Sequence, residues 1–207
     1  MKPAYQSIVR QSESYLRENG DTNWGVGWPS AHSQQKHYEV ILDVVPEGSE
    51  KVTLLDFGCG AAGLYEFIRK HGRNNIEYTG LDVSDSFLGV SREKFPDLDF
   101  YQCDILVEPE TVPQFDYVIA NGIFTQKCEL SFDEMWAYMQ SLLPVLWSKC
   151  SRALAFNVMS KHVDWERDDL FHLPLDALAS FLCRDLTRNF VFRNDYGYYD
   201  YTAYVYR

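Results

Sequence analysis

Acidic and amide side chains recur in this sequence at the ends of short apolar runs that have the character of buried strands. Asp56 lies at the end of the first run, and Asp82, Asp104 and Asn121 close the next three. The ligand of a doubly wound sheet lies beyond the carboxyl ends of its strands, so these side chains are placed to meet around one ligand. Carboxylates there accept hydrogen bonds from hydroxyl, amine and ammonium groups.

The stretch from Gly58 to Gly63 separates the first two runs and has two chemical interpretations. Gly58 and Gly60 let the backbone approach a ligand without a side-chain clash, and the helix that follows offers free amides. The string satisfies the Gly-x-Gly-x-x-Gly pattern of dinucleotide sites, and Asp82 stands 19 residues beyond it, where a carboxylate accepts from ribose hydroxyls. Asp56 favours a different ligand, because a carboxylate repels a pyrophosphate but holds the ammonium of a methionine moiety.

The elements that position these residues alternate between strand and helix periodicity. Apolar runs predict strands, and helical spacing of apolar residues predicts helices between them, which together imply a parallel doubly wound sheet. The last two strands have no helix between them and must be antiparallel. Helices are predicted near 5–19, 28–45, 64–71, 84–95, 131–147 and 175–183, and strands near 52–57, 76–82, 99–104, 115–121, 152–158, 190–193 and 198–206.

Composition narrows the functional classes. A chain of 207 residues with 46% hydrophobic residues fits one domain, which we divide into an N-terminal helical cap, 1–48, and a core, 49–207. The net charge of −11 opposes nucleic-acid binding, which depends on Lys and Arg. The sequence has neither a membrane-length apolar run nor a signal peptide, so we expect a cytoplasmic protein that does not bind membranes. Its five scattered cysteines predict reduced thiols and no metal site.

Four motifs resemble those of class I S-adenosylmethionine-dependent methyltransferases, in the same order, over about residues 50 to 160. They are Leu54-Leu55-Asp56-Phe57-Gly58-Cys59-Gly60, Tyr78-Thr79-Gly80-Leu81-Asp82-Val83-Ser84, Cys103-Asp104-Ile105 and Phe115-Asp116-Tyr117-Val118-Ile119. The resemblance implies a Rossmann-like α/β fold with a seven-stranded, mostly parallel sheet, an antiparallel last strand and helices on both faces. The family's third glycine is replaced here by Ala62. The segments around Trp24 and at the tyrosine-rich end are also similar to small bacterial methyltransferases of surface-glycan and natural-product clusters.

The same resemblance assigns a cofactor, S-adenosyl-L-methionine, and residues to hold it. It implies that Gly58 and Gly60 lie beside the cofactor, that Asp82 binds its ribose, and that Asp104 with Ile105 binds its adenine. An aromatic lid near the sulfonium, for which Trp28 is the candidate, would gain about 0.5 to 2 kcal/mol, although core packing also explains this tryptophan. The full predicted set is Asp56, Gly58, Cys59, Gly60, Asp82, Val83, Asp104, Ile105, Asn121 and Trp28.

Residues that could act on the methyl acceptor are harder to choose. The methyl group of a sulfonium is a strong electrophile, so the protein mainly aligns the acceptor and excludes water, and a positioned base takes any proton that is released. The candidates are His162 first, then Asp164 and His37. Each has a structural alternative: a surface hydrogen bond for His162, a cap or ion pair for Asp164, and a polar contact on a helix face for His37.

The leading hypothesis is therefore methyl transfer to an oxygen or nitrogen of a small-molecule acceptor, a sugar or a biosynthetic intermediate. An NAD-dependent oxidoreductase is the second hypothesis, because the glycine pattern also fits a dinucleotide. A catalytically silent subunit that binds S-adenosylmethionine is the third, because no base is obvious. We expect a monomer or a homodimer.

Overall fold

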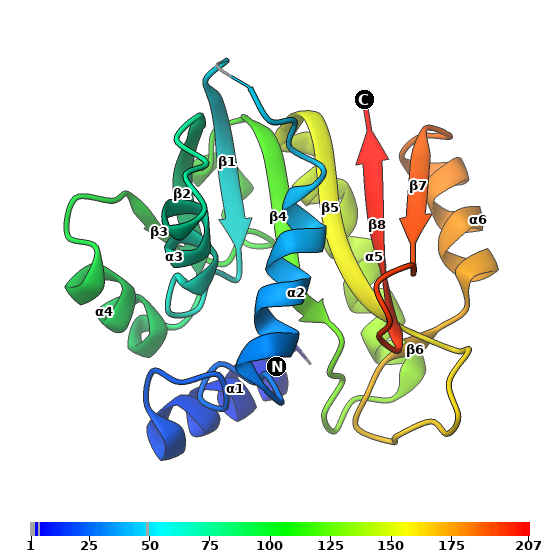
Figure 1. Ribbon diagram of the computed structural model, residues 1–207. Helices are drawn as coiled ribbons and strands as arrows, with labels where there is room; N and C mark the ends of the chain where they lie inside the picture. The colour runs from blue at the N-terminus through cyan, green and yellow to red at the C-terminus, as the bar shows by residue number, and fades with distance from the viewer. Residues whose placement is uncertain (1–2, 4, 49) are drawn as a thin grey trace.

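The computed structural model describes residue 3 and residues 5–48 and 50–207, and it is built around one eight-stranded sheet (Figure 1). Seven strands follow the order β3-β2-β1-β4-β5-β8-β7, and the two-residue strand β6 pairs with β5. The strands are β1 Val52–Phe57, β2 Ile76–Asp82, β3 Phe100–Gln102, β4 Phe115–Phe124, β5 Cys150–Ser160, β6 His172–Leu173, β7 Phe190–Arg193 and β8 Asp200–Tyr206.

Strand directions follow the predicted pattern. The pairs β1–β2, β1–β4, β2–β3 and β4–β5 are parallel, whereas β8 runs antiparallel to both β5 and β7. The predicted mostly parallel sheet with an antiparallel last strand is thus confirmed. Strand β6 was not predicted, because two residues are too few to show any periodicity.

Helices cover both faces of the sheet, as predicted, because side chains alternate along its buried strands. Leu55, Val118 and Leu154 face one way and pack in a cluster with α5 and α6. Their neighbours Leu54, Ile119 and Ala155 face the other way and pack with α2 and α3. The helices are α1 Gln6–Asn19, α2 Ala31–Leu42, α3 Gly63–Lys70, α4 Asp85–Lys94, α5 Phe132–Ser148 and α6 Leu175–Asp185.

The two N-terminal helices have different places. Figure 1 shows α2 lying along the sheet, while α1 lies across the end of the molecule at which β1 and β4 finish. Leu16 of α1 packs with Ala61 and Phe87 in a separate small cluster. Helix α1 therefore covers the edge where the predicted ligand-binding residues gather.

One predicted helix start needs correction. The helix predicted near 28–45 would hold Pro29 in its first turn, but Ser30 is the N-cap and its hydroxyl accepts a hydrogen bond from the Ser33 amide at 3.0 Å. At the N-cap position, a serine hydroxyl accepts a hydrogen bond from a free amide of the first helical turn. Proline is tolerated at the start of a helix but has no side-chain acceptor for such an amide. Among the described residues, no helix has both the length and the apolar character needed to cross a membrane.

Candidate active site

The glycine turn after β1 has a backbone that requires glycine at its first position. Gly58 has φ +70°, and a Cβ atom added there would lie 2.1 Å from Cδ1 of Ile123. Ile123 follows Gly122 near the end of β4, so the turn and β4 approach each other closely. Ala62 has φ +56°, in the left-handed region, so the alanine that replaces the family's third glycine occupies a conformation that favours glycine.

Asp82 holds this turn in place. Its Oδ2 accepts a hydrogen bond from the Gly60 amide at 3.0 Å, and its Oδ1 accepts one from the Ser84 amide at 2.9 Å. Each carboxylate oxygen has a second lone pair, so these contacts leave acceptor capacity for a ligand. Asp82 thus stabilises the turn and accepts a hydrogen bond from the N-cap residue of α4. It can still accept hydrogen bonds from ribose hydroxyls.

Asp56 is buried at the start of the same turn. Its Oδ2 accepts a hydrogen bond from the Tyr78 hydroxyl at 2.7 Å. Burial raises the pKa of Asp56 to about 7, the Tyr78 hydrogen bond opposes that shift, and the charge of Asp82 adds to it. A group with this pKa changes charge near neutral pH, and a cationic ligand would favour its ionised form.

A first cavity of about 220 Å³ brings all ten predicted cofactor residues together. Its lining includes Asp56, Gly58, Cys59, Gly60, Asp82, Val83, Asp104, Ile105, Asn121 and Trp28. None of the described residues that line it is a lysine or arginine. The Oδ1 atom of Asn121 is buried and has no hydrogen-bond partner within the described part of the chain. Such an atom is costly to leave unpaired, so it marks a place for a ligand donor.

Tyr5, at the start of α1, closes one end of this cavity and was not identified from the sequence. Its hydroxyl donates a hydrogen bond to Oδ2 of Asp104, and its ring stacks on Tyr138 with centroids 4.7 Å apart. Burial and the neighbouring Asp104 raise the pKa of Tyr5. Farther along α1, Glu13 accepts a hydrogen bond from the Ser84 hydroxyl at 2.7 Å. Asp104, the carboxylate predicted to bind an adenine amine, therefore accepts a hydrogen bond from Tyr5 at the start of α1.

Replacing Tyr5 with phenylalanine is expected to tighten the binding of S-adenosylhomocysteine, the demethylated form of the predicted cofactor, by about three- to tenfold. A ligand amine would no longer have to displace the tyrosine hydroxyl, a hydrogen bond worth about 1 kcal/mol. Isothermal titration calorimetry measures the change. Tyr199→Phe is the matched control, because it removes a hydroxyl that donates to Asp164 at 2.6 Å outside the first cavity. Weaker binding by the Tyr5 variant would contradict this interpretation.

A second cavity of about 630 Å³ adjoins the first. The two share five lining residues, which form a common wall: Tyr15, Gly27, Trp28, Thr125 and Gln126. Among the described residues, five buried polar side chains line the second cavity, one of which is Ser33. The other four are His37, Asn157, His172 and Asp200. These four side chains are called the floor below.

His37 is hydrogen-bonded at both ring nitrogens, so it is not a free base. Its Nδ1 donates to the Ser33 carbonyl at 2.7 Å, and its Nε2 lies 2.9 Å and 3.0 Å from the two oxygens of Asp200. Burial lowers its pKa, but the hydrogen bond and charge of Asp200 outweigh burial and raise the pKa overall. The rings of Trp28 and Tyr198 lie against it at 4.7 Å and 4.8 Å. His37 therefore joins α2 to β8 and holds Trp28 in the common wall.

The remaining floor residues were not predicted, and two of them, Asp200 and Asn157, connect His37 to the end of β4. Asn157 donates to Asp200 at 2.9 Å and accepts from the Gly122 amide at 2.7 Å. His172 donates from Nδ1 to the Ser160 carbonyl at 2.7 Å and accepts the Arg167 amide at Nε2, 3.2 Å away. Both nitrogens of His172 are thus engaged in hydrogen bonds.

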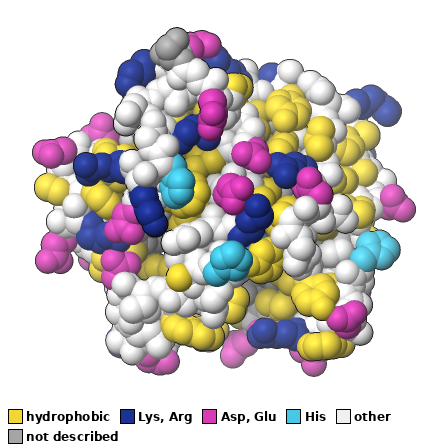
Figure 2. Space-filling model, viewed as in Figure 1, with side chains coloured by type: hydrophobic (Ala, Val, Ile, Leu, Met, Phe, Trp, Pro, Cys, Tyr) yellow, Lys and Arg dark blue, Asp and Glu magenta, His cyan; other side chains and the backbone are white. Residues whose placement is uncertain are grey.

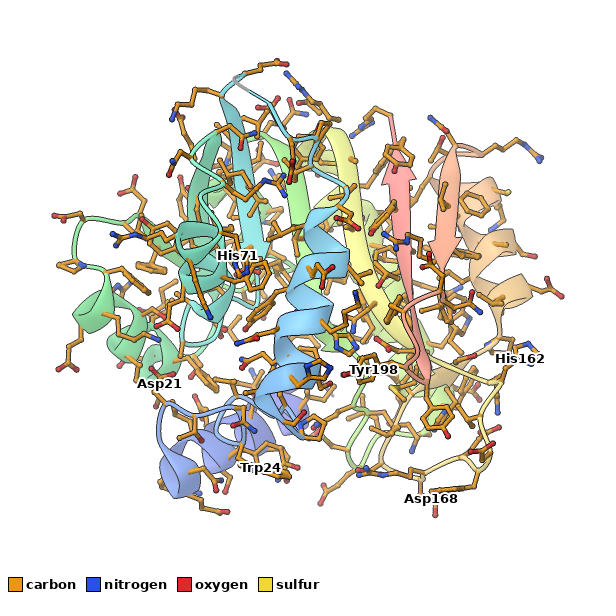
Figure 3. All side chains as sticks on the ribbon, in the orientation of Figure 1. Asp21, Trp24, His71, His162, Asp168 and Tyr198 are labelled. Carbon is orange, nitrogen blue, oxygen red and sulfur yellow. The ribbon has the colours of Figure 1, made fainter. Side chains whose placement is uncertain are left out.

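The other two candidate bases lie farther out. His162 is exposed and lines neither cavity, and Figure 3 shows it at the outer edge of the molecule, away from Tyr198. The structure therefore does not place His162 where it can act on an acceptor. Asp164 lies on the outer lining of the second cavity and accepts a hydrogen bond from Tyr199. The described residues contain no cluster of three or more His, Cys, Asp or Glu that could hold a metal.

Comparison with known proteins identifies the class to which this fold and site correspond. A family model described as a methyltransferase domain matches residues 55–146, which include the glycine turn, Asp82, Asp104 and Asn121. The predicted resemblance to class I S-adenosylmethionine-dependent methyltransferases is confirmed by this match and by the shared fold.

Particular relatives agree with the class. A putative methyltransferase of Mycobacterium tuberculosis is 28% identical over 167 residues, which cover 78% of this chain and 96% of the relative. Magnesium protoporphyrin IX methyltransferase of Synechocystis, solved with S-adenosylhomocysteine, has a TM-score of 0.66 at 16% identity and covers 98% of this chain and 99% of its own. Human N-acetylserotonin methyltransferase, solved with S-adenosylmethionine, has a TM-score of 0.63 at 14% identity, covering 98% of this chain and 57% of its own.

Proposed function

We propose that this protein transfers a methyl group from S-adenosylmethionine in the first cavity to an oxygen or nitrogen of a small-molecule acceptor in the second. The observation that carries the proposal is the common wall, in which Trp28, Thr125 and Gln126 belong to both cavities. Residues that line both cavities bring the two spaces side by side, so a ligand in one can meet a ligand in the other where the cavities adjoin.

The first cavity offers a hydrogen-bond acceptor for each donor group of S-adenosylmethionine. Asp82 would accept from the ribose hydroxyls, Asp104 from the adenine amine, and Asp56 from the ammonium, and Asn121 offers an unpaired Oδ1. A dinucleotide fits less well, because its pyrophosphate at the glycine turn would meet Asp56, with no lysine or arginine among the described lining residues. These contacts support methyl transfer over the NAD-dependent alternative.

The proposed reaction needs positioning more than acid–base chemistry. S-adenosylmethionine supplies an electrophilic methyl group on a sulfonium. The acceptor's lone pair forms the new bond to the methyl carbon, the electrons of the broken carbon–sulfur bond stay on sulfur, and the acceptor releases its proton to solvent. The wall residues hold the acceptor against the first cavity, and the apolar lining of both cavities excludes water. His37 and His172 position neighbours rather than take this proton, since their nitrogens are occupied.

The size of the second cavity supports a small-molecule acceptor, a sugar or a biosynthetic intermediate. The two solved neighbours act on small molecules by name, N-acetylserotonin and magnesium protoporphyrin IX. Figure 2 shows Lys and Arg interspersed with Asp and Glu on the viewed face rather than gathered into one basic area, which agrees with an acceptor other than a nucleic acid. We propose that the chain acts as a monomer or homodimer.

Two measurements test the proposal against its alternatives. Thermal unfolding with S-adenosylhomocysteine should show a rise in melting temperature that NAD does not produce, because a ligand stabilises the folded state that binds it. Protection by NAD alone would support the oxidoreductase instead. Transfer of a labelled methyl group to members of an acceptor panel then distinguishes an enzyme from a catalytically silent subunit, which would bind the cofactor and transfer nothing.

Affinity for S-adenosylhomocysteine is expected to rise with pH from 5.5 to about 7.5. Asp56, whose pKa is about 7, must be ionised to bind the ligand ammonium, so each pH unit below 7 costs up to about tenfold in affinity. Calorimetry in a series of buffers measures this slope. Asp56→Asn should bind more weakly and show a flat profile over the same range, and an unchanged slope would show that another group is responsible.

A further inference from the structure

We propose that the outer rim of the second cavity recognises a positively charged amine carried by the acceptor, at a point separate from the reacting atom. The rim consists of the exposed lining residues, which are Glu18, Asn19, Trp24, Pro29, Asp164, Trp165, Arg167 and Tyr199. This inference rests on the proposed function, because it takes the second cavity to be the acceptor site. It goes beyond the proposed function in assigning a positive charge to the acceptor, which methyl transfer does not require.

Two tryptophans on the rim are open to solvent. Trp24 is 60% exposed and Trp165 is 72% exposed, and neither ring stacks on any other described aromatic ring. They come from segments far apart in the sequence, the turn after α1 and the loop after β5. Figure 3 shows Trp24 beneath the N-terminal end of α2, on the same side of the molecule as Tyr198. Large aromatic faces left open at a cavity entrance are suited to stack on a ligand or to attract a cation.

The carboxylates on the rim have no cationic partner in the described chain. Glu18 accepts a hydrogen bond from the Ser14 hydroxyl at 2.9 Å, and Asp164 accepts from the Tyr199 hydroxyl. Arg167 lines the same cavity, but its guanidinium is paired with Asp169 at 2.5 Å and 2.9 Å. The rim therefore combines unneutralised negative charge with open aromatic rings, which is the arrangement that binds ammonium groups.

The floor offers little to bind the charged amine of the acceptor, which leaves the rim as the place that binds it. Asp200 pairs with His37, so its carboxylate is already engaged and is not free for an acceptor amine. Asp200 also accepts from Asn157, which occupies more of its lone pairs. A cavity of about 630 Å³ with a mainly apolar lining holds far more than an ammonium ion. The acceptor thus has an apolar body between its charged group at the rim and its reacting atom at the common wall.

A matched set of three ligands tests this inference by calorimetry or NMR titration at low salt. Phenethylamine, 2-phenylethanol and phenylacetate share one ring and differ in charge, being cationic, neutral and anionic at pH 7. Phenethylamine should bind about 3- to 30-fold more tightly than 2-phenylethanol, with phenylacetate weakest. The preference should shrink as salt is added, because the rim is exposed. Equal affinities, or a preference for phenylacetate, would overturn the inference.

Variants assign the preference to the rim. Trp165→Leu and Asp164→Asn should each reduce the preference for phenethylamine at least about threefold, and both residues are exposed, so folding is not at risk. Asp168→Asn is the matched control, since it makes the same charge change in the same loop at a residue that does not line the cavity. Persistence of the full preference in both rim variants would overturn the assignment.

The two proposals fail in different ways. S-adenosylhomocysteine binding is measured on the same samples, and its presence without a charge preference would reject the rim and leave methyl transfer standing. Loss of S-adenosylhomocysteine binding with the charge preference intact would reject the cofactor and retain the cation site. Each titration is therefore run both with and without S-adenosylhomocysteine.

Discussion

Replacing Asp200 with asparagine is expected to lower the free energy of unfolding by about 3 to 5 kcal/mol. The change removes the carboxylate that balances the buried His37 ring, so the ring must either keep an uncompensated charge or give up its proton. Urea denaturation followed by circular dichroism measures the difference. Asp43→Asn is the control, because Asp43 pairs with Arg193 at 2.6 Å and also links the end of α2 to the last strands, but it is half exposed. Its loss should cost at most about 1 kcal/mol.

The pH dependence of the free energy of unfolding tests the same ion pair in a second way. The pKa of His37 is raised by folding, so its contribution to stability is complete below the pKa of an unfolded histidine, about 6.5, and is lost as pH rises through the higher folded value. The wild-type protein should therefore lose stability over this window. Asp200→Asn should not show that loss, because nothing then favours the charged ring. An identical pH profile in both proteins would contradict the ion pair.

Replacing Asp82 with alanine is expected to weaken the binding of S-adenosylhomocysteine by about 1 to 3 kcal/mol. The variant loses charge-assisted hydrogen bonds to the ribose, and it also frees the Gly60 and Ser84 amides that set the shape of the turn. Calorimetry measures the affinity. Asp85→Ala is the control, since Asp85 is an exposed carboxylate three residues later that does not line the cavity. Unchanged affinity in the Asp82 variant would rule out its role in binding the ribose.

Most of the fold and the first cavity could be predicted because short, continuous sequence patterns define them. A strand that ends in a glycine or a carboxylate can be read from six or seven residues, and parallel strands bring such ends to one edge. Asp56, Asp82 and Asp104 follow successive strands, so a sequence pattern was enough to place them in one cavity.

The second cavity could not be predicted in the same way, because its floor is assembled from distant segments. His37 and Asp200 are 163 residues apart, and in the first cavity the unpredicted contact between Tyr5 and Asp104 likewise joins residues 99 apart. Neither pair has a sequence pattern, since each depends on where a cap helix comes to rest. His37 also looked like a possible base from its residue type alone, and only its two occupied nitrogens show that its role is structural.

Under the proposed function, the wall shared by the two cavities links their ligands thermodynamically. Trp28 contacts both spaces and rests on His37, so a ligand that fixes its ring on one side prepares the surface met by the other. By linkage, the factor by which the cofactor changes acceptor affinity equals the factor by which the acceptor changes cofactor affinity. His37 of α2 and Asp200 of β8, which hold the Trp28 ring from the floor of the second cavity, would thereby influence this cooperativity.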